Sequence, residues 1–237
     1  MTIFETIDPA STLSRFDFWW ALDGDWVEAP NERRGGCSGV QRIRTGEGKQ
    51  AYAKRQVGHI YRSLRHPLGR PTVLRERDAL IACNRIGITV PEILYCAATR
   101  EGQTWKALLV SAALEGYRSL EDWYACPVNR SLSSPVHDAF LKQLGATLAR
   151  LHRARWQHGC LYPKHIFVRT TEEDAAPSFQ FALLDLEKCR RRLSADAAAR
   201  RDLHQLRRHS SWSTADWQTL IYGYLAAFGR PIKGLMQ

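Results

Sequence analysis

Apolar and polar positions alternate over short segments in the first third of the chain. Residues 25–29, 40–44 and 51–57 have this character, and the glycine-containing stretches 31–39 and 45–49 separate them. Short alternating segments joined by glycine turns are typical of antiparallel strands. We therefore predict a meander at the start of the fold.

A helical pattern follows over residues 70–88. Pro71 suits a first helical position, and Gly87 is a natural place for the helix to end. The apolar stripe consists of Leu74, Leu80 and Ile81. Strand character returns at 90–96 and 105–114, and we interpret Ala112 to Gly116 as a hinge before a short helical run.

The second half of the chain is predominantly helical. Apolar residues recur at steps of three and four over 134–156, with Ser134 as the expected N-cap and Pro135 just inside the helix. Two short apolar strands, 165–169 and 181–187, flank a polar loop at 170–178. Helices are predicted at 196–209 and 213–229, the latter opened by a capping-box spacing of Ser213 and Asp216.

Strands first and helices second predict an α+β fold in two lobes. We place a β-rich lobe with one helix at residues 1–113 and a mostly helical lobe at 114–237. The chain has 237 residues, 44% of them hydrophobic, which is enough to bury a core.

The charge balance indicates an anionic partner. The formal net charge is +10 and the isoelectric point about 9.6. Such a field concentrates phosphates, nucleic acids or acidic lipid headgroups. Nucleic acid is not expected, because the basic stretches have no aromatic interleaving.

Cysteine spacing and the N-terminus indicate the compartment. Six scattered cysteines without a CxxC pair give little support to a zinc site or a disulfide framework, so a reducing cytoplasm fits best. Met1 to Leu13 lacks the basic and apolar regions of a signal peptide, and no window is long enough to span a membrane. We expect a soluble cytoplasmic protein that can lie peripherally at an anionic inner membrane.

Three features of the first lobe suit nucleotide phosphates. Gly35, Gly36 and Gly39 lie in an expected turn whose backbone amides could approach a phosphate, although most such loops are plain hairpins. Lys54 ends a strand directly afterwards and could reach a phosphate, or be an exposed lysine. Glu76 could orient Lys54, or be a solvated helix acid.

The second lobe contributes candidates around the segment QHGCLYPKHIFV. Asp185 ends an apolar strand, where it could hold a metal ion or cap a turn. His165 comes seven residues after His158 and could ligate a metal or bind a phosphate, although a lone histidine is more often structural. Together these residues predict a phosphotransferase site.

This order of motifs resembles the protein-kinase-like superfamily, and specifically the lipopolysaccharide kinase family with the InaA and heptose-kinase group. The resemblance runs from about Asp25 to Phe228. It rests on the glycine turn, AYAK, the helix glutamate, the hinge LLVSAALEG, HGCLYPKH and LLDLE. In that family a histidine commonly replaces the catalytic-loop asparagine, as His165 does here.

The resemblance implies roles position by position. Lys54 would bind the ATP phosphates and pair with Glu76, while Asp185 and His165 would hold Mg²⁺. The nucleotide would lie under the Gly35 to Gly39 turn and against Ala112 and Leu114. His158 would be a structural histidine that Asp202 braces.

Cys160 departs from the family pattern, because it occupies the position of the base aspartate, and Gly159 replaces the usual arginine. A thiol matches a carboxylate only if its pKa is strongly lowered, for example by Lys164. Glu187 acting through a water is an alternative, and so is a Cys160 that is simply a small core residue. Phosphoryl transfer depends mostly on positioning and charge neutralisation, so we expect slower catalysis rather than none.

The leading hypothesis is an ATP- and Mg²⁺-dependent kinase that phosphorylates a sugar of the lipopolysaccharide core, heptose or similar. Basic stretches such as 54–77, 187–193 and 200–209 would attract a phosphorylated glycolipid at the membrane. The alternative is a pseudokinase-like module that binds nucleotide or a partner without chemistry. An aminoglycoside-type phosphotransferase is disfavoured, because that class keeps the loop aspartate and asparagine.

Overall fold

The computed structural model of the chain describes two compact units. The described residues are 14–33, 35–46, 48–64, 66–173 and 176–235. The first unit contains residues 14–74 and 92–113, and the second contains residues 75–91 and 114–235. The stretch Met1 to Leu13, in which we expect no signal peptide, lies outside the described residues.

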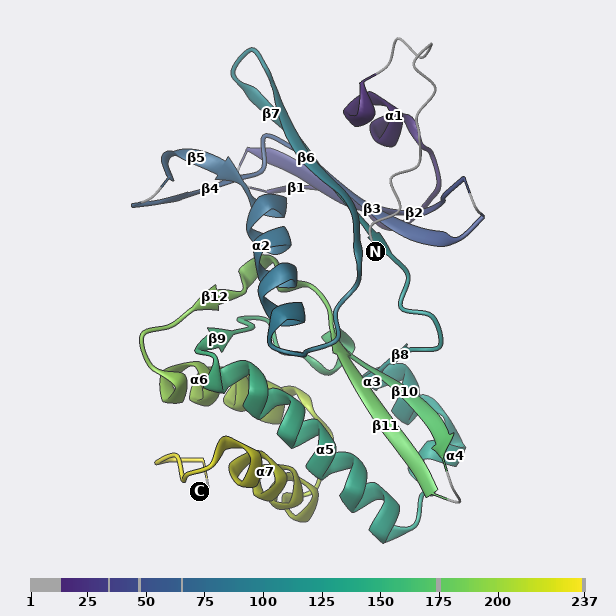
Figure 1. The fold of residues 1–237 in the computed structure, drawn as a ribbon, viewed down its shortest axis with the longest axis vertical. Helices are drawn as coiled ribbons and strands as arrows, with labels where there is room; N and C mark the ends of the chain where they lie inside the picture. Colours follow the sequence, from purple (N-terminus) through teal and green to yellow (C-terminus); the bar gives the residue numbers. More distant parts are fainter. Residues whose placement is uncertain (1–13, 34, 47, 65, 174–175, 236–237) are drawn as a thin grey trace. The chain divides into compact units, whose positions relative to one another are not determined.

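The first unit is built on an antiparallel sheet with the strand order β1-β2-β3-β7-β6 (Figure 1). Its strands are β1 Asp25–Arg33, β2 Gly36–Arg44, β3 Gln50–Val57, β6 Ile93–Glu101 and β7 Thr104–Ala112. Ala51, Ala53, Leu108 and Val110 are buried on one face. The aromatic side chains of helix α1, Arg15–Ala21, pack against that face, a helix that the sequence pattern did not predict.

The glycines of the expected phosphate turn occupy different places from those predicted. Gly35 has a φ of +74° and forms the turn, whereas Gly36 begins β2 and Gly39 lies inside it. A Cβ atom on Gly36 would lie 2.5 Å from the carbonyl carbon of Gly58, and one on Gly39 would lie 2.7 Å from the Trp26 ring. The prediction that all three form the turn is therefore wrong, because close packing of neighbouring chain requires two of them.

A second hairpin, absent from our sequence prediction, leads into helix α2. It consists of β4 Ile60–Ser63 and β5 His66–Pro71, and α2 spans Thr72–Arg85. Pro71 therefore ends the strand rather than opening the helix. The side-chain carbonyl of Gln56 on β3 accepts hydrogen bonds from the Thr72 hydroxyl at 2.9 Å and the Val73 amide at 3.1 Å.

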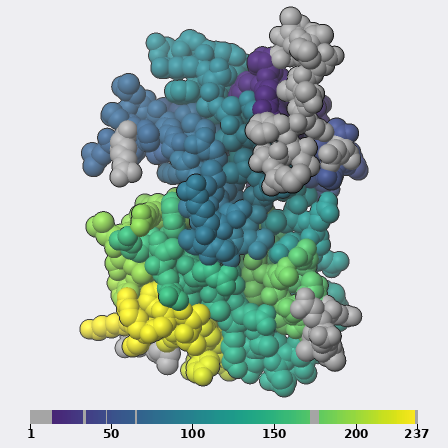
Figure 2. Space-filling model, in the orientation of Figure 1, coloured from purple at the N-terminus to yellow at the C-terminus, as the bar shows by residue number. Residues whose placement is uncertain are grey.

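The second unit has helix α5, Ser134–Arg153, at its centre (Figure 1). Phe140, Leu144 and Leu148 on its inner face are fully buried. Around it lie α3 Leu120–Ala125, α4 Pro127–Arg130, α6 Ala195–His209 and α7 Thr214–Phe228, with the strands β8 Arg118–Ser119, β10 Ile166–Glu173 and β11 Ala176–Leu183. In the space-filling view α7, in yellow, forms part of the surface of this unit (Figure 2).

Two sequence expectations for this unit are corrected and one is confirmed. Ser133, not Ser134, is the N-cap of α5. The polar stretch expected as a loop at 170–178 mostly continues β10 and β11, whose pairing keeps register from Ile166 with Leu183 to Glu173 with Ala176. The capping box of Ser213 and Asp216 at the start of α7 is present as predicted. None of the helices in the described part of the chain is long and apolar enough to cross a bilayer.

Candidate active site

The buried carboxylate of Asp202 on α6 holds the start of residues 158–165, which we call the catalytic-loop segment. This segment follows the short strand β9, Trp156–Gln157, which pairs with β12, Arg190–Arg191. Asp202 accepts hydrogen bonds from the backbone amides of His158 at 2.6 Å and Gly159 at 3.0 Å. His152 on α5 contacts the same carboxylate at 3.2 Å. Although burial acts to raise it, the pKa of Asp202 is lowered by hydrogen bonds from His152 and the Gly159 amide, so the carboxylate is ionised at neutral pH.

His158 is a structural histidine, because both ring nitrogens are used inside the fold. Its Nε2 donates to the carbonyl of Leu184 at 2.9 Å, and its Nδ1 accepts from the amide of Cys160 at 3.3 Å. The ring is completely buried, and burial lowers the pKa of His158 to about 4. The neutral ring therefore fixes the loop to the end of β11.

Gly159 and Lys188 are in close contact beside the position of the missing base. Gly159 has a φ of +81°, and a Cβ atom there would lie 2.8 Å from the Lys188 carbonyl oxygen. A side chain such as the usual arginine would clash with this backbone. Glycine at this position is thus required by the short helix η2, Leu186–Lys188, that packs against it.

Cys160 is a buried thiol rather than a thiolate. It is 5% exposed, and burial raises its pKa, although the nearby Lys188 ammonium, close enough for a hydrogen bond, acts in the opposite direction. The cation beside the sulfur is therefore Lys188 and not Lys164, which is exposed. Sequence spacing could not identify Lys188, because η2 brings it back onto the loop from 28 positions further along the chain.

His165 and Asp185 face each other beside this loop. His165 lies in the 3-10 turn η1, Pro163–His165, and its Nδ1 bonds the carbonyl of Cys160 at 2.8 Å. Because a carbonyl only accepts, Nδ1 donates this bond, which leaves Nε2 as the ring nitrogen that a metal ion could use. That atom lies 3.6 Å from a carboxylate oxygen of Asp185.

Asp185 has an unusual backbone conformation at the end of β11. Its φ of 55° and ψ of 59° are left-handed, which is costly for a residue with a side chain. The turn at Asp185 directs the chain into η2, and the Asp185 side chain is 40% exposed. Arg75 on α2 donates to the carbonyl of Glu187 at 2.6 Å, which ties α2 to the segment after Asp185.

This pair offers two possible ligands to a metal ion, the carboxylate of Asp185 and the imidazole of His165. Within the described residues, no cluster of three or more His, Cys, Asp or Glu side chains is arranged to hold one. Mg²⁺ commonly uses one or two protein carboxylates and takes the rest of its ligands from water and substrate phosphates. The Asp185 carboxylate fits this pattern, and the neighbouring His165 ring stays a predicted ligand.

In the first unit, Lys54 shares a face of β3 with the residue that anchors α2. Side chains two apart on a strand point to the same side, so Lys54 lies on the side of Gln56, which holds the first turn of α2. Glu76, one turn further along that helix, is only 8% exposed and is therefore not a solvated acid. Lys54 belongs to the first unit and Glu76 to the second, and their pairing stays a prediction.

The hinge residues expected to face the nucleotide use backbone groups in hydrogen bonds within the fold. Ala112 pairs with Ala51 on β3, and its amide donates to the carbonyl of Glu92 at 2.9 Å. The carbonyl of Leu114 accepts from the amide of Tyr117 at 3.2 Å. Their contact with a nucleotide likewise stays a prediction.

Comparisons with known proteins agree with this arrangement. Residues 17–224 match the sequence model of the lipopolysaccharide kinase (Kdo/WaaP) family. Over 218 residues the chain is 41% identical to Protein InaA of Escherichia coli (strain K12), which covers 92% of this chain and 98% of that protein.

Two solved structures share the fold at low sequence identity. WaaP in complex with acyl carrier protein matches with a TM-score of 0.71 and 17% identity, over 94% of this chain and 86% of that chain. The Rio2 kinase-ADP/Mg²⁺-phosphoaspartate complex from Chaetomium thermophilum matches with 0.50 and 15%, over 90% and 64%. These likenesses confirm the predicted protein-kinase-like α+β fold.

Proposed function

Because the chain belongs to the lipopolysaccharide kinase (Kdo/WaaP) family, we propose that it transfers the γ-phosphoryl group of ATP to a hydroxyl of a lipopolysaccharide-core sugar, heptose or similar. The bond from the γ-phosphorus to the ADP oxygen breaks, a bond to the sugar oxygen forms, and the hydroxyl proton leaves to solvent. The observation that carries the proposal is the juxtaposition of Asp185 and His165 next to the braced loop.

Asp185 and His165 are proposed to hold Mg²⁺ together with the nucleotide phosphates. When bound, the ion would neutralise charge on the phosphates during transfer. The Nδ1 bond to the Cys160 carbonyl aims Nε2 of His165 toward Asp185. This contact makes the loop backbone, rather than the Cys160 thiol, the part of residue 160 that serves the site.

Lys54 is proposed to bind the nucleotide phosphates and to pair with Glu76. Its shared strand face with Gln56 and the burial of Glu76 support this pairing. The turn at Gly35, with Ala112 and Leu114, is proposed to border the nucleotide. Gly36 and Gly39 are proposed to let β2 pack closely enough to shape this border.

No ionised base replaces the loop aspartate at Cys160, because burial keeps the thiol protonated. General-base assistance contributes roughly 10²- to 10⁴-fold, whereas positioning and charge neutralisation supply most of the acceleration of phosphoryl transfer. We expect catalysis that is slow but present.

The acceptor is proposed to be an anionic glycolipid at the cytoplasmic face of a membrane. Arg190, Arg192 and Arg201 lie near one another, and burial together with these positive neighbours lowers the pKa of Arg190. None of the three is engaged in an ion pair with another described residue. Such a group of cations suits phosphates on a lipid surface.

A pseudokinase-like binding protein is the second candidate, favoured by one observation, the protonated thiol of Cys160. It would bind nucleotide or a partner without transferring phosphate. The structural neighbour WaaP was solved with acyl carrier protein, so that protein is a suitable partner to try.

The deciding experiment measures ATP binding and phosphate transfer separately. Thermal shift with ATP, with and without Mg²⁺, reports binding, and labelled ATP with dephosphorylated core oligosaccharide reports transfer. We expect Asp185→Asn to abolish transfer, Asp138→Asn on α5 to leave it unchanged, and Cys160→Asp to raise it. Binding without transfer in both the native chain and Cys160→Asp would instead establish the pseudokinase alternative.

A further inference from the structure

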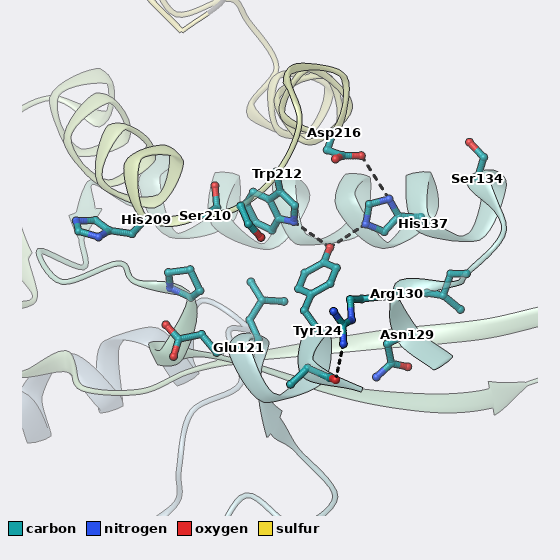
Figure 3. Close-up of a pocket in the computed structure, with 15 residues that line it drawn as sticks. Glu121, Tyr124, Asn129, Arg130, Ser134, His137, His209, Ser210, Trp212 and Asp216 are labelled. Carbon is teal, nitrogen blue, oxygen red and sulfur yellow. Dashed lines mark hydrogen bonds and ion pairs between the residues drawn. The ribbon is translucent and has the colours of Figure 1, made fainter. Parts of the chain in front are cut away.

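The second unit contains a cavity of about 620 Å³ to which no role has been assigned above. It lies among α3, α4, α5, η1 and the connection from α6 to α7, and Figure 3 shows its lining side chains. This volume is in the range of small-molecule sites. Its walls combine aromatic rings with hydroxyl, amide and ionisable groups.

One wall is a chain of hydrogen-bonded side chains. The indole Nε1 of Trp212 donates to the Tyr124 hydroxyl at 2.9 Å, and that hydroxyl lies 2.8 Å from Nε2 of His137 (Figure 3). The Tyr124 oxygen accepts from the indole, because an indole N–H only donates. The other ring nitrogen of His137, Nδ1, lies 3.5 Å from a carboxylate oxygen of Asp216.

This chain makes the wall rigid before any ligand arrives. Asp216 also accepts from the amide and hydroxyl of Ser213 in the α7 capping box. Burial raises the pKa of Tyr124, so its hydroxyl keeps its proton. Four elements, α3, α5, α7 and the segment before α7, thus hold the aromatic rings in place.

The charge of the cavity differs from that of the whole chain. Among its described lining residues, the acids Glu121 and Asp216 stand against Arg130 alone, apart from two histidines. The chain as a whole has a formal charge of +10. No hydrogen bond or ion pair from another described residue engages the Glu121 carboxylate. The cavity therefore attracts a phosphate less than the basic surface of the chain does, whereas the exposed Glu121 carboxylate can accept hydrogen bonds from the hydroxyl groups of a neutral ligand.

The cavity adjoins the proposed metal pair through a single side chain. The centroid of the Tyr162 ring lies 5.6 Å from that of the His165 ring and 4.7 Å from that of the His209 ring. His209 lines the cavity, as does Pro163 of the same short turn as His165. The centroids of the two imidazole rings are therefore about 10 Å apart at most.

We propose that this cavity binds a neutral, unphosphorylated sugar ring of the acceptor, with Glu121 accepting from its hydroxyl groups and the partly exposed Tyr124 ring packing on an apolar face. The inference rests on the proposed kinase function and deepens it. It separates two parts of the acceptor, because the cationic arginines would attract its phosphates while the near-neutral cavity takes the ring that carries none.

The experiment follows the indole N–H resonance of Trp212 by NMR, assigned with Trp212→Phe, during titration with a neutral methyl heptoside. We expect this resonance to move with the heptoside and to stay fixed with inorganic phosphate. Glu121→Gln should weaken heptoside binding about tenfold, the loss of one charge-assisted hydrogen bond, and His209→Ala should also weaken it. The matched variant Glu92→Gln, an exposed acid of the first unit, should bind like the native chain.

The proposal is overturned if the Trp212 resonance does not move with heptoside, if phosphate moves it equally, or if Glu121→Gln binds heptoside normally. Nucleotide binding, measured by thermal shift on the same samples, distinguishes this failure from failure of the proposed function. Heptoside binding without nucleotide binding supports the cavity and contradicts the kinase. Phosphate transfer with an unmoved Trp212 resonance contradicts only the cavity.

Discussion

Replacing Asp202 with asparagine should destabilise the second unit strongly, because this one carboxylate bonds two backbone amides of the loop and the ring of His152 on α5. The new side-chain amide would keep one carbonyl acceptor for the two backbone amides of His158 and Gly159. Its NH₂ group would leave the other backbone amide facing a donor. His152 would lose its ionised partner at the same time.

The magnitude follows from these contacts. A hydrogen bond to a charged group contributes about 1.5–3 kcal/mol, and a buried donor without a partner costs about 1–3 kcal/mol. We therefore expect Asp202→Asn to lower the free energy of unfolding by about 3–5 kcal/mol. That is a large part of the 5–15 kcal/mol, roughly, that stabilises a typical domain.

Urea unfolding followed by tryptophan fluorescence measures this loss, and hydrogen exchange of the His158 and Gly159 amides locates it. Asp196→Asn on the same helix is the control, because Asp196 pairs with Arg230 in an exposed ion pair, and such pairs contribute little to stability. If Asp202→Asn shifts the urea midpoint no more than Asp196→Asn does, and the two amides stay protected, the proposed bracing of the loop is incorrect.

Three further predictions concern the same loop. The unfolding free energy should fall by about 3 kcal/mol as pH decreases from about 6.5 to 4, because the unfolded chain binds a proton on His158 that the folded chain excludes; urea titrations across this range would show a flat profile if the ring were already charged when folded. Gly159→Ala should cost about 3 kcal/mol, since strain at positive φ adds to the clash with Lys188, whereas Gly229→Ala, at positive φ in open space, should cost about 1 kcal/mol; equal melting temperatures would contradict the clash. Alkylation of Cys160 near neutral pH should be much slower than that of the half-buried Cys37, as followed by peptide mass spectrometry, and equal rates would mean an accessible thiolate.

Local patterns predicted the elements that depend on local interactions. The periodic apolar positions of α5 and the capping box of α7 are observed, since both features act within a few residues. The hairpin β4–β5 and helix α1 were missed. Alternation is weak in the hairpin, and α1 buries its aromatic rings only against strands that lie far from it in the sequence.

In the candidate site, too, the residues identified from the sequence differ from those whose roles depend on long-range contacts. Residue types and order led to Asp185, His165 and His158, which the structure places around one short loop. Lys188 and Gln56 were not found, because their roles depend on contacts made after the chain turns back on itself. The placement of Gly36 and Gly39 failed for a similar reason, since a glycine needed for close packing looks the same in sequence as one needed for a turn.

The bracing of the loop separates its shape from the chemistry of residue 160. An ionised carboxylate is tolerated in a protein interior only when it is paired, and the partners of Asp202 are the loop amides and His152. Neither set involves the thiol of Cys160, and it is the carbonyl of Cys160 that bonds His165. A carboxylate introduced at position 160 would enter a loop that is already formed, next to the Lys188 ammonium. Cys160→Asp therefore tests whether the base is what the chain lacks, without first disturbing how the loop folds.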